Sequence, residues 1–510
     1  MENRVTIFNT LTKKVETIIP NEDGKIGMYT CGPTVYHYAH IGNLRCYIME
    51  DVLEKTLRYA GYDVKRVMNI TDVGHLSSDA DTGDDKMAKA AEKEHKTVME
   101  IADFYTKAFF ADCEKLNIKR PDVVQPATGC IPEFIHMVEV LLEKGYAYVA
   151  GDNVYFDTSK LKDYYVLSPQ DNRDMMVGVR DDVDEDTNKK NRSDFVLWFT
   201  KSKFGNQDLK WESPWGLGYP GWHIECSCIS LKYLGERIDI HCGGVDNIFP
   251  HHTNEIAQSE SYLGHKWVNY WFHVHHLTEK GGAKMSKSSG KSLNLAYVEE
   301  MKYRPIVYRF FCLQSHYRKP LEFAFETLDN VGAAYDKLKK RISELKKEAG
   351  LDHAAVKALS EKIENARRKA VHDSLDVKAA VAEAAADSGV NAEKYLEFTE
   401  NFMNAICSDQ NTSMGITVLY DMLRADIDAL TKVVLAESFD YVLSLDLTND
   451  DEPAAQADAE LEAYILEKIA ERKEAKKNKD FAKADAIREE LAGKGVAIKD
   501  TREGTVWELI

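Results

Sequence analysis

The chain has 510 residues, of which 44% are hydrophobic and 29% charged, and its formal net charge is -18. This length allows about three or four domains, and the composition is that of a soluble globular protein. No apolar run approaches the roughly 18 residues of a membrane span, and the N-terminus shows no signal-peptide pattern. The negative charge excludes a protein that binds nucleic acid over its whole surface. We therefore expect a cytoplasmic protein without a membrane segment, whose nine cysteines are reduced.

Strand and helix patterns alternate in the first part of the chain. A buried strand is predicted over 25–31, a helix over 41–59 with apolar residues at near-helical spacing, and a second strand over 63–71. A second strand-to-helix unit follows over 238–241 and 252–263, after an insertion of about 115–213. Two such units predict an α/β fold, a Rossmann-like nucleotide-binding domain over 1–325 that is split by the inserted subdomain.

The composition changes after about Glu326, where proline almost disappears and Ala, Leu, Lys and Glu dominate. Amphipathic patterns there predict an α-helical bundle over 326–446. The polar stretch 447–457 is typical of a linker. The last segment, 459–510, is predicted to be a small mixed α+β domain with a helix pair and a short β segment.

The first motif, His40-Ile41-Gly42-Asn43, stands where the first strand leads into the first helix. Unpaired N–H groups and the positive end of the dipole make a helix start suitable for phosphate, and glycine allows a close approach. A histidine there can donate to phosphate oxygens. The alternative is a histidine that only caps the helix or packs in the core.

The second motif, Lys284-Met285-Ser286-Lys287-Ser288, has glycines on both sides. Two lysines in such a loop can offset the charge that develops on a transferring phosphoryl or nucleotidyl group. The alternative is a solvated basic loop.

A third constellation carries metal-ligand chemistry. His251 and Glu255 are four residues apart on one predicted helix, so both side chains lie on one face. Cys31 ends the first strand, and Cys226 lies in a separate segment. Two thiolates, an imidazole and a carboxylate are suitable ligands for one zinc ion. Ordinary buried cysteines and a surface His–Glu pair are the alternative.

The first two motifs, in this order, resemble the paired signatures of class I aminoacyl-tRNA synthetases. Within that class, the sequence is similar to the cysteinyl-tRNA synthetase family around Cys31, around Cys226, over 249–258 and over 480–488. The family's four zinc ligands fall on Cys31, Cys226, His251 and Glu255. Asn43 departs from the founding motif, which has a second histidine at that position.

The resemblance implies activation of L-cysteine by ATP with Mg²⁺ and its transfer to tRNA(Cys), by a monomer with one zinc ion. It implies that the C-terminal domain binds the anticodon, where a basic run from Lys468 to Lys479 and Trp507 are available. Zinc would select the substrate thiol over the hydroxyl of serine, which a hydrophobic pocket distinguishes poorly. The implied catalytic residues are His40, Lys284 and Lys287; the implied ATP-binding residues are His40, Gly42, Asn43, Asp246 and Lys287; and the expected substrate-binding residues are Gly32, Thr71, Trp222 and His223.

Three alternatives remain at this point. A mycothiol-type ligase that joins cysteine to an amino-sugar has a similar catalytic core but lacks the C-terminal region. A non-enzymatic zinc- and RNA-binding module would not need the lysine loop. A zinc hydrolase would need an open coordination position and a general base.

Overall fold

The computed structural model describes residues 5–73, 87, 90, 94, 96–167, 186–201, 209–278, 293–449, 459–477, 480–493, 496–501 and 504–509. The chain divides into two compact units, Met1–Thr448 and Asn449–Ile510. The boundary falls in the stretch whose polar composition predicted a linker.

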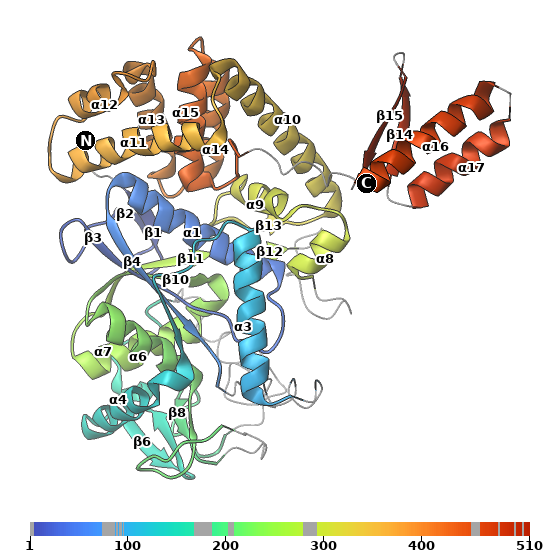
Figure 1. Ribbon diagram of the computed structural model, residues 1–510. Helices are drawn as coiled ribbons and strands as arrows, with labels where there is room; N and C mark the ends of the chain where they lie inside the picture. Colours follow the sequence, from blue (N-terminus) through green and yellow to red (C-terminus); the bar gives the residue numbers. More distant parts are fainter. Residues whose placement is uncertain are drawn as a thin grey trace. The chain divides into compact units, whose positions relative to one another are not determined.

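A five-stranded parallel sheet forms the centre of the first unit (Figure 1). Its strand order is β11-β10-β3-β4-β5, so strands from the two sequence halves, β3 and β10, are neighbours. Their carboxyl ends therefore open onto one edge of the sheet, the usual place for a ligand in such folds. The strands are β3 (Lys25–Thr30), β4 (Asp63–Ile70), β5 (Val123–Pro126), β10 (Ile238–Gly244) and β11 (Val268–Val274). The predicted Rossmann-like fold is confirmed.

Helices cover both faces of this sheet. Successive residues of a strand point to opposite faces, and Met28 and Tyr29 of β3 accordingly belong to two different cores. Helix α1 (Ile41–Ala60) packs in the core of Met28, and α6 (Trp222–Leu234) packs in the core of Tyr29. Gly61 ends α1 in the left-handed conformation, with φ 108°, which glycine adopts without strain.

Strand β10 continues three residues beyond its expected end at His241. Residues 242–244 pair with Phe272, His273 and Val274 of β11, although two of the three are glycines. A Cβ on Gly243 would lie 2.8 Å from Cε1 of His252, so the glycine allows the following helix to approach the strand. That helix is α7 (His251–Leu263).

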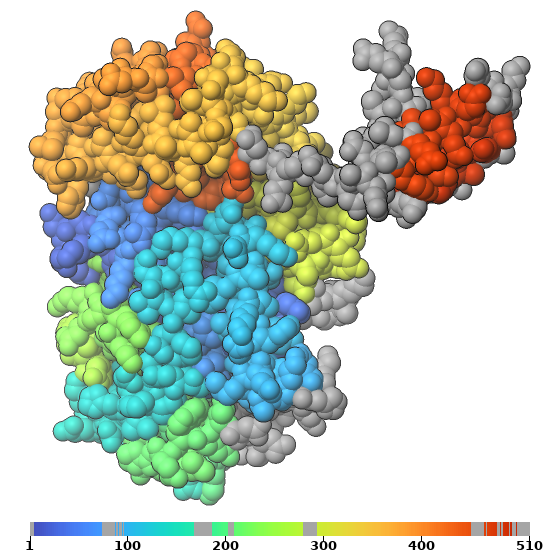
Figure 2. All heavy atoms as spheres, viewed as in Figure 1, coloured from blue at the N-terminus to red at the C-terminus, as the bar shows by residue number. Residues whose placement is uncertain are grey.

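The insertion is a small subdomain with its own antiparallel sheet of order β6-β7-β8-β9. It follows a long helix, α3 (Val98–Lys115). In the helical segment after residue 325, helix α15 packs against α1. This segment and α1 share one hydrophobic core (Figures 1 and 2). The elements of the subdomain are α4 (Ile131–Glu143), β6 (Ala147–Ala150), β7 (Asn153–Phe156), β8 (Phe195–Phe199) and β9 (Tyr219–Pro220). Further α-helices and strands of the unit are β1 (Thr6–Asn9), β2 (Lys14–Thr17), β12 (Leu277–Thr278), β13 (Leu321–Glu322), α8 (Leu295–Glu300), α9 (Pro305–Leu313), α10 (Phe325–Ala349), α11 (His353–His372), α12 (Val377–Ala385), α13 (Ala392–Ile406), α14 (Thr412–Arg424) and α15 (Ala429–Leu443).

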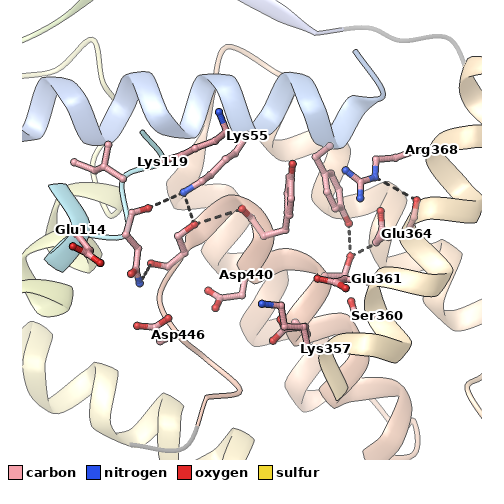
Figure 3. A pocket seen from close by; sticks show the side chains of 17 residues that line it. Lys55, Glu114, Lys119, Lys357, Ser360, Glu361, Glu364, Arg368, Asp440 and Asp446 are labelled. Atoms are coloured by element: carbon pink, nitrogen blue, oxygen red, sulfur yellow. Dashed lines mark hydrogen bonds between the residues drawn. The ribbon is translucent and has the colours of Figure 1, made fainter. Parts of the chain in front are cut away.

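A polar cavity of about 520 Å³ lies between α1, the segment after α3, α11 and α15 (Figure 3). At its edge, Nζ of Lys55 donates to the Asn117 carbonyl and to Oγ of Ser444, both at 2.8 Å. The same ammonium pairs with Asp51 at 2.7 Å. One partly buried lysine thus joins α1 to the end of α15.

The second unit contains α16 (Ala459–Lys477) and α17 (Phe481–Gly493), followed by the antiparallel pair β14 (Val496–Thr501) and β15 (Gly504–Leu509). Its small core is formed by Ile465, Ile487, Leu491 and Val496. This is the predicted mixed α+β arrangement. In the described part of the chain, no helix combines the length and the apolar composition needed to cross a bilayer.

Candidate metal centre and nucleotide site

The four expected zinc ligands come together at the carboxyl edge of the sheet. Cys31 follows β3 directly, Cys226 lies in the second turn of α6, and His251 and Glu255 face the same way from the start of α7. Their ligand atoms all lie within 4.8 Å of one another. The Sγ atoms of Cys31 and Cys226 are 3.9 Å apart, and Nε2 of His251 is 3.0 Å from Oε1 of Glu255.

A second group of ligand atoms meets the same distance condition. It shares Cys31 and Glu255 with the first group but takes His241 and His252 in place of Cys226 and His251. Nε2 of His252 lies 3.3 Å from Sγ of Cys31. The geometry therefore offers two overlapping sets of four ligands. Cys226 belongs to the first set and not to the second.

The charge of the cluster suits a divalent cation. Burial opposes ionisation of Cys226, but the hydrogen bond from Cys31 and the nearby His251 outweigh it and lower the Cys226 pKa to about 6. Burial also opposes ionisation of Glu255, yet His241 and His251 lower its pKa. Burial disfavours the charged form of His251 too, but Glu255 and Cys226 raise its pKa to about 10. Zinc binding would replace that proton and neutralise the two anions, so these residues fit the ion.

Oε1 of Glu255 is buried and pairs with Nε2 of His251 at 3.0 Å, without a hydrogen bond of good geometry from the residues that the structure describes. A metal ion between the two side chains would satisfy this oxygen and the imidazole nitrogen together. The donor set of sulfur, nitrogen and oxygen is the set that zinc prefers.

Three further histidines, His223, His241 and His252, lie against the four ligands. Nδ1 of His223 lies 2.9 Å from Nδ1 of His251, and Nε2 of His241 lies 2.8 Å from Oε2 of Glu255. His252 contacts Cys31, and its Nδ1 lies 2.8 Å from Nε2 of His273.

His273 was not expected from the sequence, because it occupies a position in β11 with no metal-ligand spacing. The strand order places it beside Gly243 of β10, so only the sheet pairing could have revealed it.

The expected substrate residues line the same edge. The Trp222 ring packs against His251, with ring centroids 4.1 Å apart and the ring planes tilted by 34°. The amide of Gly32 donates to Oδ1 of Asn69 at 2.7 Å, and the Thr71 hydroxyl donates to Glu225 at 2.7 Å. Asn69 and Glu225 were not expected from the sequence. Because a Cβ on Gly32 would lie 1.7 Å from the Asn69 carbonyl oxygen, only glycine fits there.

The expected phosphate site lies at the start of α1. His40 is the N-cap residue, and its Nδ1 accepts from the amide of Gly42 at 3.1 Å. Asn43 is exposed in the first turn. Asp246 lies just beyond β10, where Oδ1 is 3.2 Å from Nε2 of His276. Lys284 and Lys287 lie outside the described residues.

Cys242 carries no ligand role in either set. It is fully buried in the core shared by α1 and the sheet, as a packing residue.

Comparison with known proteins matches a segment of each unit to a known domain family. Residues 17–333 match the tRNA synthetases class I (C) catalytic domain, and residues 451–507 match the cysteinyl-tRNA ligase anticodon binding domain. A cysteine–tRNA ligase of Treponema denticola is 43% identical over 509 residues, covering 98% of this chain and 99% of the relative. Those of Borrelia garinii subsp. bavariensis and Borreliella burgdorferi are 40% identical over 503 residues, covering 98% of both chains in each case. With the parallel sheet and the thiol-rich cluster at its edge, these matches show that the chain belongs to the cysteine–tRNA ligases, the cysteinyl-tRNA synthetase family of class I.

Proposed function

We propose that this protein activates L-cysteine with ATP to cysteinyl-adenylate and transfers the cysteinyl group to the 3′ end of tRNA(Cys). The observation that carries the proposal is the buried cluster of thiol, imidazole and carboxylate at the edge where β3 and β10 meet. It lies in the fold of a class I synthetase, and the similarity to cysteine–tRNA ligases extends over the full chain.

The proposed zinc ligands are Cys31, Cys226, His251 and Glu255. This set supplies two thiols, whereas the overlapping set with His241 and His252 supplies one. When bound, zinc supplies a soft Lewis acid that prefers a thiolate and lowers the pKa of a thiol, so cysteine is favoured over serine. In this arrangement His223 and His241 orient His251 and Glu255.

Adenylation needs alignment and charge neutralisation more than covalent help from the protein. We assign phosphate binding to His40, Gly42 and Asn43 at the start of α1, and ribose binding to Asp246. Lys284 and Lys287 are assigned the role of stabilising the negative charge that develops on the α-phosphate, and Mg²⁺ accompanies ATP. We assign the substrate side to Gly32, Thr71, Trp222 and His223.

We assign the catalytic domain to 1–325, the helical bundle to 326–446 and anticodon binding to 459–510, in a cytoplasmic monomer with one zinc ion. The anticodon match over 451–507 supports the last assignment. Only some of the cationic side chains in the basic run on α16 are exposed for contact with tRNA. Arg472 is 6% exposed and Lys468 pairs with Glu471 and Glu490, whereas Lys473 is exposed.

The test is ATP–pyrophosphate exchange with cysteine and, in parallel, with serine, before and after removal of the metal. We expect exchange with cysteine only, lost on chelation and restored by zinc. Absence of exchange with zinc-loaded protein would contradict the ligase function. Exchange that survives complete zinc removal would contradict the proposed selection of the thiol. Charging of tRNA then separates the protein from a cysteine:amino-sugar ligase.

A further inference from the structure

Arg45 is a buried cation in the second turn of α1, one turn beyond the proposed phosphate site. It is 0% exposed. Its Nη1 donates to the carbonyls of His275 and His276 at 2.5 and 2.8 Å. Its Nη2 donates to the Lys319 carbonyl at 2.8 Å and, at 3.5 Å, to that of His316. A single side chain thus holds two separate backbone segments against α1.

The first of these segments belongs to the other half of the nucleotide site. His275 and His276 connect β11 to β12, and the His276 imidazole pairs with Asp246 at 3.2 Å, which is the proposed ribose partner. Arg45 therefore links the start of α1, where phosphate binding is proposed, to His276, whose imidazole pairs with Asp246. This link crosses between the two sequence halves.

The start of α1 also contacts the chain on the other side of the lysine motif. The amide of Ile41 donates to the Leu293 carbonyl at 2.9 Å, and His40 forms a β-bridge with Asn294. Residues 276 and 293 bracket the segment that contains Lys284 and Lys287. Both described flanks of that segment are thus hydrogen-bonded to the first two turns of one helix.

The partners of Arg45 explain why arginine suits this position. A guanidinium has five donors in a fixed planar arrangement, so it can bond several carbonyls whose positions are then set relative to one another. Lysine has a single ammonium and cannot span the same separation. Among the described residues, no carboxylate forms an ion pair with Arg45, so its hydrogen bonds are made to the backbone.

We propose that Arg45 is a positioning residue for ATP, which fixes the phosphate end of the nucleotide site at α1 relative to the ribose end at His276 and Asp246. The proposal rests on the function proposed above. Arg45 does not contact substrate in this assignment. Its effect passes through the His275–His276 backbone, so it concerns the nucleotide and leaves the metal cluster and the cysteine pocket intact.

The experiment compares Arg45→Gln and Arg45→Lys with Arg309→Gln in the zinc-loaded, full-length protein. Arg309 is the matched control, because it is equally buried and also donates to backbone carbonyls, those of Leu443 at 2.7 Å and Leu116 at 2.9 Å. It lies on α9, outside the proposed nucleotide site. Steady-state exchange gives kcat and the KM values for ATP and cysteine, and zinc content and melting temperature are measured on the same samples.

We expect Arg45→Gln to lower kcat/KM for ATP by about 10- to 100-fold, since small misplacements of reacting groups have effects of this size. The KM for cysteine and the zinc content remain at wild-type values, and Arg45→Lys is intermediate. Arg309→Gln lowers the melting temperature without a selective effect on ATP.

The proposal is overturned if Arg45→Gln matches Arg309→Gln in its ATP parameters, or if it raises the KM for cysteine as much as the KM for ATP. It is also overturned if both Arg45 variants fail to fold, because Arg45 would then be a stability residue. A wild-type protein without cysteine-dependent exchange would instead refute the ligase function, whatever the variants do.

Discussion

Individual side chains decide which ligand atoms the metal cluster presents. His251 has Nδ1 against His223, so its Nε2 faces Glu255. Cys31 faces both Cys226 and His252, which is why two ligand sets satisfy the same distances. Single substitutions can therefore tell the two sets apart.

Cys226→Ser tests the proposed ligand set. Replacing the thiol by a hydroxyl removes a soft ligand, so we expect zinc affinity to fall by about 10- to 100-fold or more. Cys228→Ser is the control, because Cys228 is buried two residues away against Met137 and lies outside both sets. Zinc content after dialysis against a chelator series is the measurement. Retention of zinc by Cys226→Ser together with its loss in His252→Asn would favour the overlapping set.

Gly32→Ala tests the close approach of β3 and β4 at the site. The added Cβ would lie 1.7 Å from a backbone oxygen that cannot move without displacing β4, so we expect destabilisation of about 3 kcal/mol or more. At Gly332 in α10, an added Cβ would make an ordinary van der Waals contact with Val307 at 3.8 Å, so Gly332→Ala should be neutral or stabilising by up to about 1 kcal/mol. Urea unfolding midpoints give both values. Equal midpoints for the two variants would contradict this explanation.

Spacing on one helix face predicts the convergence of His251 and Glu255, because i and i+4 side chains share a face. Asn69, Glu225 and His273 could not be found in this way. Each reaches the site from a strand or helix whose neighbours are set by sheet order, and that order depends on contacts between residues far apart in sequence.

At the scale of elements, α1 has an unusual set of buried charges. Its apolar residues predict the helix correctly, but Glu50, Asp51 and Glu54 are also buried. Asp51 pairs with Lys55 and Arg309, and Glu54 pairs with Arg58 and Arg66. The sequence could not show this burial, because helical periodicity alone would place such residues on a solvated face. The helix is covered by α9 and α15, which lie hundreds of residues later in the chain.

Glu50 gives this helix a pH dependence. Burial raises the Glu50 pKa to about 8, although Arg66 and Cys46 act in the opposite direction. Between the ordinary carboxyl pKa and about 8, the folded state binds more protons than the unfolded state, so Glu50 contributes stability below that window and loses it as pH rises through it. Between pH 5 and 8, we expect the free energy of unfolding of Glu50→Gln to change by about 3 kcal/mol less than that of the wild type.

The measurement is urea unfolding of the wild type and Glu50→Gln at both pH values. The same substitution at an exposed position of α4, Glu139→Gln, should leave the wild-type pH dependence unchanged. Parallel pH dependences for all three proteins would show that Glu50 does not titrate in this range.

At the scale of the whole molecule, the chain consists of two compact units, and the second has its own core. The polar stretch 447–457 predicts their boundary, although its first residues, Leu447 and Thr448, are buried in the first unit. The split between 325 and 326 in the sequence analysis is less distinct in space, because the helical segment shares one core with α1 and the sheet. A change in composition reports a change in secondary structure, and it does not show whether the two segments pack together.

A chain truncated after Thr448 tests the roles of the two units. We expect cysteine-dependent exchange to be retained, because the proposed metal and nucleotide residues all lie in the first unit. Charging of tRNA should fall by about 100-fold in kcat/KM, since one of two linked binding modules is lost. Both activities are measured on the same preparation. Full tRNA charging by the truncated chain would contradict the anticodon assignment, and loss of exchange would show that the units depend on each other.

The origin of the metal cluster in distant segments also has a consequence for synthesis on the ribosome. Cys31 and His252, which are in contact, are 221 residues apart in sequence. At translation rates of about 5–20 residues per second, the first thiol is made roughly 10–45 s before its partners emerge. During that interval Cys31 lacks the other ligands of either set, so its thiol is open to oxidation or to the wrong metal. Zinc can therefore bind to a complete ligand set only after the chain has been synthesised as far as Glu255.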